Sequence, residues 1–393
     1  RLLSGNMISE IIPHAVFNPE DDTYDLHLKV KLEDNISVRI GGNVSTTSSN
    51  QIYLGLSYQN LNYNAKEFTF DGQLGKIYNN VQLMGKIDFA TSIPTSYRLI
   101  ASISTFDYFK KEKLFSRNDK PAFNQKDERF VKLKVGLPFL SNKRAEFGVG
   151  AAKIQDRYFQ KNVIDFDKDK YDKSTYSLFG GSISFNGSTL NSRQFPTQGA
   201  HEELVAQIFT GKECFYPGES SDNKKASEER HSWLQLSYMK EKYHRMAEHW
   251  TLGWYLKALY SSRNFSENYT ATMMQAGEFA PTAHGQLMYN EAFRANQFVG
   301  VGVRPIYRFN QMFHVRGEFY GFMPIFPIER NSINKAYYGK AFSRFEYLGE
   351  VSVVCQLPFG AISAYVNHYS SPKREWNVGL TLGWQLFNYR FFE

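Results

Sequence analysis

The stretch from residue 376 to residue 386 alternates almost perfectly between apolar and polar side chains. Because successive side chains of a β-strand point to opposite faces, this alternation predicts a ribbon with one apolar side and one polar side. Trp376 and Trp384 lie near the two ends of the apolar side. Aromatic residues that flank an apolar middle are typical of a strand that crosses a membrane and is anchored at both interfaces.

The same alternation recurs from residue 36 onward, in segments whose lengths are mostly near the ~9–11 residues that span a bilayer as a tilted strand. The segments are 36–46, 51–61, 66–76, 79–90, 97–109, 128–139, 143–153, 174–187, 199–209, 230–242, 249–261, 295–308, 311–322, 343–356, 359–369 and 375–386. We therefore predict an all-β fold, a transmembrane antiparallel β-barrel of about 16 strands over residues 35–393. The alternative is a soluble all-β protein, but such proteins usually have shorter strands and fewer aromatic residues at strand ends.

Composition favours the membrane interpretation. Aromatic residues make up 16% of the chain. Mean hydropathy is −0.46, and no run approaches the roughly 18–20 apolar residues of a spanning helix. A barrel reconciles these values, because half of each spanning strand faces water. The net charge of +7 indicates either a mixed surface with basic loops or attraction to anionic lipid headgroups. No compact basic stripe is present, so nucleic acid is not an expected partner.

Residues 1–34 differ from the rest of the chain. Residues 11–17 and 24–32 read as two strands around a polar turn. Because a lone hairpin is marginally stable, we expect the tail of a periplasmic POTRA-like domain or a plug segment. The chain begins at Arg1 without a signal peptide. A barrel must be exported, so we expect a processed or truncated product.

The connections predict an orientation. In the second half of the chain, short and long connections largely alternate. Outer-membrane barrels have short periplasmic turns and longer external loops. We therefore expect a bacterial outer-membrane location with both termini in the periplasm.

Three local features resemble the Omp85 superfamily of outer-membrane barrels. Residues 193–199, Arg-Gln-Phe-Pro-Thr-Gln-Gly, resemble the mid-barrel turn of that family, and their key positions are Phe195, Pro196 and Gly199. Residues 25–31, running into 38–43, resemble the junction between a POTRA domain and the first barrel strand. The aromatic last strand resembles the barrel-assembly signal of the family. Its candidate residues are Gly379, Leu382, Trp384, Phe387 and Phe392.

Within this superfamily, the sequence is most similar to the barrels of patatin-like phospholipases from Bacteroidetes-type bacteria. Residues 279–285 and 290–298 resemble their long loop and the strand that follows it. The resemblance implies a barrel that anchors or translocates a patatin-like lipase domain lying upstream of this chain. The alternative is a standalone pore, or a barrel that takes part in outer-membrane protein assembly or transport.

The resemblance also implies partners. They are outer-membrane lipids, the barrel-assembly machinery during biogenesis, and either a second copy of the chain or partner lipoproteins. Lipopolysaccharide is included among the lipids, because lysines in the long loops can pair with lipid phosphates. These lysines are Lys110, Lys111, Lys113, Lys161, Lys168 and Lys170.

The sequence departs from the family at one motif. Most Omp85 proteins carry Val-Arg-Gly-Phe/Tyr on the sixth external loop, whose arginine pairs with an acidic residue on the barrel wall. Residues 262–294 lack this motif, and Arg294 is the only arginine late in that loop. His314, Arg316 and Glu318 share the strand face that we expect to line the lumen. The simpler interpretation is ordinary charges in a water-filled lumen, and the alternative is a loop-locking Arg294–Glu318 pair.

The chain carries no catalytic motif. A patatin-like lipase needs Gly-x-Ser-x-Gly, and residues 180–184 lack the last glycine. Any enzymatic activity would belong to the Ser-Asp dyad of the implied upstream domain. We expect no cofactor and no metal, because Cys214 and Cys355 are far apart and His244 and His249 lack a closed ligand set.

Overall fold

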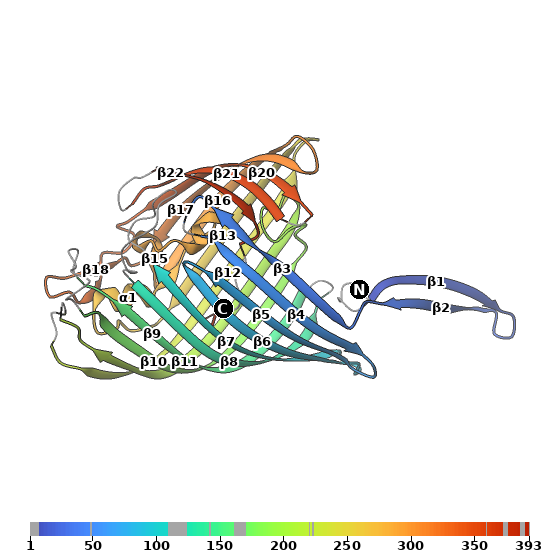
Figure 1. Ribbon diagram of the computed structural model, residues 1–393, viewed down its shortest axis with the longest axis horizontal. Coiled ribbons are helices and arrows are strands. Elements are labelled where there is room, and N and C mark those ends of the chain that lie inside the picture. Colours follow the sequence, from blue (N-terminus) through green and yellow to red (C-terminus); the bar gives the residue numbers. More distant parts are fainter. Residues whose placement is uncertain are drawn as a thin grey trace.

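The structure is a computed structural model that describes residues 8–47, 49–108, 124–140, 143–160, 170–219, 221, 224–358, 360–371, 376–385 and 390–392. Within these residues, 16 antiparallel strands close into a barrel (Figure 1). The strands, in chain order, are β3 (Ile36–Ser45), β4 (Gln51–Leu61), β5 (Ala65–Gly75), β6 (Tyr78–Phe89), β7 (Thr95–Tyr108), β8 (Asn124–Phe139), β9 (Lys143–Tyr158), β10 (Asp172–Ser188), β11 (Gly199–Tyr216), β12 (Ser227–Arg245), β13 (Trp250–Ser261), β16 (Gln297–Arg308), β17 (Phe313–Pro324), β20 (Glu346–Leu357), β21 (Gly360–Tyr369) and β22 (Trp376–Gly383). The predicted fold class and all the predicted barrel strands are confirmed.

The two faces of the barrel wall have opposite chemistry. On β8, Val131 and Leu133 are exposed on the outer face, whereas Glu128 and Lys132 are buried on the inner face. The same alternation runs through the other strands. An apolar exterior around a polar interior is the inverse of a water-soluble protein and is what a bilayer-spanning barrel requires.

Strands β8 to β12 are longer than the sequence pattern predicted, at 16 to 19 residues. The predicted segment 199–209, for example, continues to Tyr216 in β11. Most of the extra residues lie at the end of the barrel where the long connections gather, which we call the loop end; the opposite end is the turn end. The apolar alternation stops where side chains leave the bilayer, but the hydrogen-bond ladder continues into water.

The connection between β13 and β16, residues 262–296, folds into the barrel. It contains α1 (Tyr269–Gln275) and a short pair of strands, β14 (Gly277–Glu278) and β15 (Arg294–Ala295). We call it the inward loop. Asn268 donates to the Tyr158 hydroxyl on β9 (2.7 Å) and its side chain caps α1 by accepting from the amide of Ala271. No described helix is long and apolar enough to cross a membrane.

Two further hairpins lie outside the barrel wall. β18 (Ile328–Arg330) pairs with β19 (Ala336–Tyr338) between β17 and β20. β1 (Ile8–Asn18) pairs with β2 (Thr23–Leu32), is almost wholly exposed, and projects away from α1 and β18 (Figure 1). The two N-terminal strands form as predicted, whereas their assignment to a periplasmic domain stays a prediction.

The last strand is shorter than predicted. β22 ends at Gly383, whose φ of +115° is in the left-handed region that favours glycine. The Trp384 amide then donates to the Gly42 carbonyl (2.8 Å). Because the chain leaves the strand here, Trp384 does not continue the apolar outer face; it packs against buried Phe195 and Val354. The prediction of an outward Trp384 is therefore wrong.

The predicted assembly signal is split. Gly379 and Leu382 lie on β22, and Leu382 is exposed on the outer face. Phe387 lies outside the described residues. Phe392 packs inside the barrel, with its ring centroid 5.1 Å from that of Phe209. Of the described signal residues, Leu382 alone lies on the outer face, because Gly379 is buried on the inner face of β22.

Candidate functional site in the lumen and at the seam

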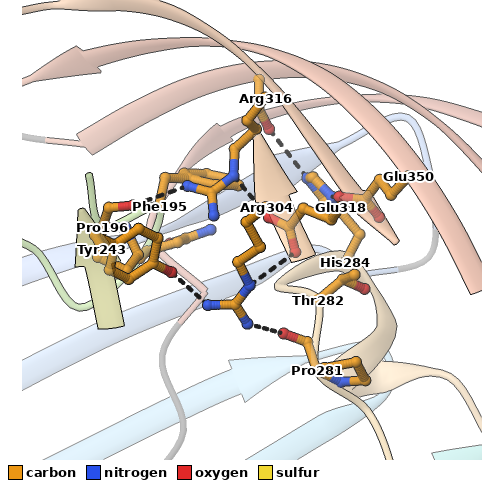
Figure 2. Close-up of polar contacts among 12 residues, drawn as sticks. Phe195, Pro196, Tyr243, Pro281, Thr282, His284, Arg304, Arg316, Glu318 and Glu350 are labelled. Atoms are coloured by element: carbon orange, nitrogen blue, oxygen red, sulfur yellow. Dashed lines mark hydrogen bonds and ion pairs between the residues drawn. The ribbon is translucent and has the colours of Figure 1, made fainter. Parts of the chain in front are cut away.

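Three segments from distant parts of the sequence meet in the lumen. They are the inward loop, the mid-barrel turn between β10 and β11 (residues 189–198), and the tail segment after β22 (residues 390–392). A buried network of charges joins the first two to the inner wall (Figure 2).

Arg304 on β16 is one centre of this network. Its guanidinium donates to Glu241 and to the Tyr243 hydroxyl, both on β12. It also donates to the Tyr320 hydroxyl (2.5 Å) and, across the lumen, to the Pro281 carbonyl of the inward loop (3.2 Å) (Figure 2). Arg304 is 4% exposed. The guanidinium of Arg304 thus connects β12 and β17 to the inward loop.

Arg316 on β17 is the second centre. Its Nε lies 2.6 Å from Glu318 Oε1, and its Nη1 donates to the Pro196 carbonyl (3.3 Å). The guanidinium carbon lies 5.6 Å from the Phe195 ring centroid. Arg316 therefore binds the mid-barrel turn as Arg304 binds the inward loop (Figure 2). The two arginines are linked, because Glu318 also lies 3.7 Å from Arg304 Nε.

The mid-barrel turn reaches across the lumen because its backbone is specialised. Phe195 has φ +55° and Gly199 has φ +92°. A Cβ at Gly199 would lie 2.1 Å from the Thr189 carbonyl oxygen, so only glycine fits there. On the far side, Gln356 of β20 donates to the carbonyls of Gln194 (3.3 Å) and Phe195 (3.1 Å).

His284 fixes the tip of the inward loop to the opposite wall. Its Nδ1 lies 2.7 Å from Glu350 Oε1 on β20, and its Nε2 lies 3.0 Å from the Ser363 hydroxyl on β21. The imidazole stacks on Tyr365 at a centroid distance of 3.7 Å. Ser363 in turn hydrogen-bonds Thr381 on β22 (2.6 Å). The loop tip is thereby connected to the last strand of the barrel.

The order Glu350–His284–Ser363 matches the connectivity of a hydrolase triad, but its surroundings do not. Ser363 is 0% exposed, and its hydroxyl is already shared with Thr381. The His284 ring belongs to the loop, so any movement that admitted a substrate to Ser363 would separate the histidine from its partners. The arrangement is a latch rather than a catalytic centre.

The tail segment occupies another part of the lumen. The Phe391 amide donates to Glu128 (2.5 Å), and Lys132 donates to the Arg390 carbonyl (2.8 Å). Phe391 is 1% exposed and packs in an aromatic cluster with Phe130 and Phe209. The Arg390 guanidinium lies 3.7 Å from Glu278 of the inward loop.

A cavity of about 420 Å³ remains between the inward loop, the tail segment and the wall. Its lining carries charges of both signs. The charged lining residues are Lys126, Glu128, Glu203, Lys257, Arg263, Glu278, Arg294 and Arg390. The space that remains in this part of the lumen is lined by charged and apolar side chains together.

The structure places the predicted lumen residues as follows. His314, Arg316 and Glu318 are buried on the inner face of β17. Arg294 does not pair with Glu318: it pairs with Glu278 (3.0 Å), because the β14–β15 ladder sets these two residues opposite each other. Burial opposes the charge on Arg294, but Glu278 acts together with Tyr289 and Tyr108 to raise its pKa.

The sequence reasoning missed several residues of the network, among them His284, Arg304 and Glu350. Arg304 and Glu350 lie at inward positions of predicted strands, so strand parity could have placed them in the lumen. His284 lies in a loop, and nothing in its local sequence indicates which wall it contacts.

The seam between β22 and β3 closes the barrel with few pairs. Thr381 pairs with Ser45, Leu382 with Val44, and Gly383 with Asn43. By comparison, β21 and β22 are paired from Ala361–Gly383 to His368–Trp376. Most of β22 and β3 therefore has no strand partner at the seam among the described residues.

No protein-family model matches this sequence, and no curated protein matches it. Solved structures do match. BamA from Haemophilus ducreyi lacking POTRA domains 1–3 has a TM-score of 0.60 at 14% identity, over 96% of this chain and 75% of that chain. CdiB from Acinetobacter baumannii gives 0.51 at 7% identity, over 96% and 66% of the two chains. CdiB from Escherichia coli gives 0.52 at 8%, over 95% and 67%.

At these identities the likeness concerns the fold. The architecture is a closed 16-stranded barrel whose fold is similar to those of BamA and CdiB. The chain spans about two thirds of the length of the CdiB chains and three quarters of the BamA chain.

Proposed function

We propose that this chain is an Omp85-type outer-membrane barrel that takes part in the assembly or transport of polypeptides, with the β3–β22 seam as the site of action. The seam is the observation that carries the proposal. Opening it breaks three residue pairs, Thr381–Ser45, Leu382–Val44 and Gly383–Asn43, together with the flanking hydrogen bonds that join Trp384 to Gly42 and Thr46 to Leu380. The exposed backbone of such an edge can pair with a strand of another polypeptide.

The filled lumen argues against a standalone diffusion pore. The inward loop and the mid-barrel turn are fixed by buried ion pairs and hydrogen bonds, and the tail segment is packed among aromatic rings. A pore for small solutes would instead keep an aqueous channel. A barrel whose interior is occupied by its own segments and whose seam is weakly paired suits opening through the wall at the seam.

The latch provides a connection between lumen and seam. His284 of the inward loop hydrogen-bonds Ser363, and Ser363 hydrogen-bonds Thr381, which is one of the three paired β22 residues. A displacement of the loop would remove support from that residue. We propose that loop position and seam opening are coupled in this way.

Cross-linking the seam tests the proposal. Val44→Cys and Leu382→Cys lie directly opposite each other, within the geometry that a disulfide accepts. Both native cysteines are first replaced (Cys214→Ser, Cys355→Ala). In proteoliposomes that contain the barrel and an unfolded outer-membrane client, we expect the oxidised protein to lose client folding and the reduced protein to regain it. Client folding is measured by protease protection.

The matched control is Val38→Cys with Leu56→Cys. This pair joins β3 to β4 and leaves the seam free, so it should retain activity in both redox states. If the oxidised seam variant folds clients as well as its reduced form does, the proposal is wrong.

The second candidate function is to anchor a patatin-like lipase domain. It rests on the resemblance of residues 279–285 and 290–298 to the barrels of those enzymes. The test is the mass and sequence of the native polypeptide isolated from its own membrane. A chain much heavier than 45.4 kDa with a Gly-x-Ser-x-Gly turn in the additional part would support this function. Additional sequence without that turn, or a mass equal to this chain, would refute it.

We also propose that the turn end and β1–β2 face the periplasm and that the loop end faces outward. The longest described connection, residues 262–296, lies at the loop end, and outer-membrane barrels carry their longer loops outside. In this orientation β1–β2 belongs to a periplasmic POTRA-like region.

A further inference from the structure

A groove of about 500 Å³ runs over the outer face of β6 to β9. Its outward lining is apolar along most of its length, with Leu83, Ile103 and Val131 exposed and small Ala101 and Ala151 between them. Small residues among larger ones leave room on a wall that otherwise meets lipid directly. The groove therefore has the shape and polarity to hold an acyl chain.

Two cations lie at one end of this groove. Arg129 on β8 and Lys153 on β9 are both exposed on the outer face. They are register partners, directly opposite each other in the ladder. Side chains in such a pair are neighbours, and like charges in this arrangement destabilise the sheet. Neither has an acidic partner among the residues that the structure describes.

Two other cations on the same outer face are neutralised. Lys212 on β11 lies 2.7 Å from Glu228, and Arg157 on β9 pairs with Asp127. Arg129 and Lys153 differ from these cations, because the side chain opposite each of them is the other cation. An external anion between the two cations would attract both of them and offset their mutual repulsion.

The depth of the pair indicates where such an anion would come from. Toward the turn end, the next outward residues are apolar Val131 on β8 and Ala151 on β9; toward the loop end they are Asp127 and Gln155. Arg129 and Lys153 thus lie at the border between the apolar band and the polar rim. This is where lipid phosphates lie in a bilayer.

We infer that Arg129 and Lys153 bind the phosphate of a lipopolysaccharide lipid A, with one of its acyl chains in the groove below. A phosphate monoester carries close to two negative charges and can accept hydrogen bonds from both cations at once. The phosphodiester of an ordinary phospholipid carries one charge, which matches two cations less well. The choice of an outer-leaflet lipid rests on the proposed orientation of the barrel.

Native mass spectrometry of the full chain in mild detergent tests the inference. The probes are diphosphoryl lipid A, dephosphorylated lipid A and phosphatidylglycerol. For the unaltered protein we expect binding of diphosphoryl lipid A that neither other lipid matches. The double variant Arg129→Gln/Lys153→Gln should bind diphosphoryl lipid A at least about tenfold more weakly, as expected for the loss of two charge-assisted hydrogen bonds.

The control variant Lys66→Gln/Lys242→Gln removes the same charge from exposed positions toward the turn end. It should bind diphosphoryl lipid A as the unaltered protein does. In gel electrophoresis with SDS, unboiled protein that migrates differently from boiled protein verifies that each variant is folded. Unchanged binding in the Arg129/Lys153 variant, an equal loss in the control, or equally tight binding of phosphatidylglycerol would each overturn the inference. None of these outcomes bears on the proposed opening of the seam, because none of the substituted residues lies on β3 or β22.

Discussion

At the scale of single residues, the lumen depends on buried arginines that each serve several elements. Arg304 contacts β12, β17 and the inward loop through one guanidinium. Arginine suits this position because its planar fork presents five donors in fixed directions, whereas lysine presents a single charged point. Removing Arg304 leaves Glu241 without its counter-charge in a buried site, and Glu318 then depends on Arg316 alone.

We predict that Arg304→Leu destabilises the folded barrel by about 3–5 kcal/mol, the usual cost of breaking a buried ion pair by removing one partner. The measurement is the urea concentration at which half of the unboiled protein loses the gel mobility of the folded barrel. Lys212→Gln is the control, since its partner Glu228 is exposed; this change should leave the midpoint in place. A midpoint in Arg304→Leu equal to that of the unaltered barrel would mean that the network is dispensable for stability.

At the scale of elements, the mid-barrel turn shows how a short connection can carry a tertiary role. Its residues sit between β10 and β11, yet they contact β17 and β20 on another part of the wall. The turn can extend inward because Phe195 and Gly199 take positive φ values. The conformation is strained for most residues, and the contacts with Arg316 and Gln356 stabilise it.

Gly199→Val tests this element. The φ of +92° and the 2.1 Å approach to the Thr189 carbonyl leave no space for a β-branched side chain. We expect a loss of at least about 1–3 kcal/mol from backbone strain alone, and a reduced yield of folded, heat-modifiable protein. Gly85→Val is the matched control, because a Cβ there meets nothing within 4 Å. Normal yield from Gly199→Val would contradict the strained-turn explanation.

At the scale of the whole molecule, segments of the same chain occupy the lumen of the barrel. The inward loop, the mid-barrel turn and the tail segment occupy the lumen together, and Arg390 of the tail lies 3.7 Å from Glu278 of the loop. Because these segments touch each other as well as the wall, the release of one loosens the others.

We predict that Phe391→Ala/Phe392→Ala raises the conductance of single barrels in planar bilayers. Phe391 is buried, and a Phe→Ala change in a packed core costs about 3–5 kcal/mol, which is enough to undock a short segment. The control is Phe309→Ala/Phe313→Ala, which removes two exposed aromatic rings from the outer face. Equal conductance of the two double variants would show that the tail segment does not limit the channel.

The sequence by itself determined the wall of the barrel. Successive side chains of a strand point to opposite faces because of backbone geometry. The alternation of apolar and polar residues within each strand therefore shows which side chains face lipid and which face the lumen. This is why the strands from β3 to β22 were found, and why His314, Arg316 and Glu318 were placed inside. The same rule failed at Trp384, because alternation in the sequence cannot show where the hydrogen-bond ladder stops.

Only the tertiary structure decided which segments occupy the lumen and which residues they contact there. His284 meets Glu350 and Ser363 across 66 and 79 positions of sequence, and Phe391 meets Glu128 across 263. Arg294 paired with Glu278 rather than Glu318, because a two-residue ladder within the loop fixed its neighbour. Such partners are set by the closure of the ring and by the path of loops through its interior. Those depend on all the strands at once, and no local pattern in the sequence encodes them.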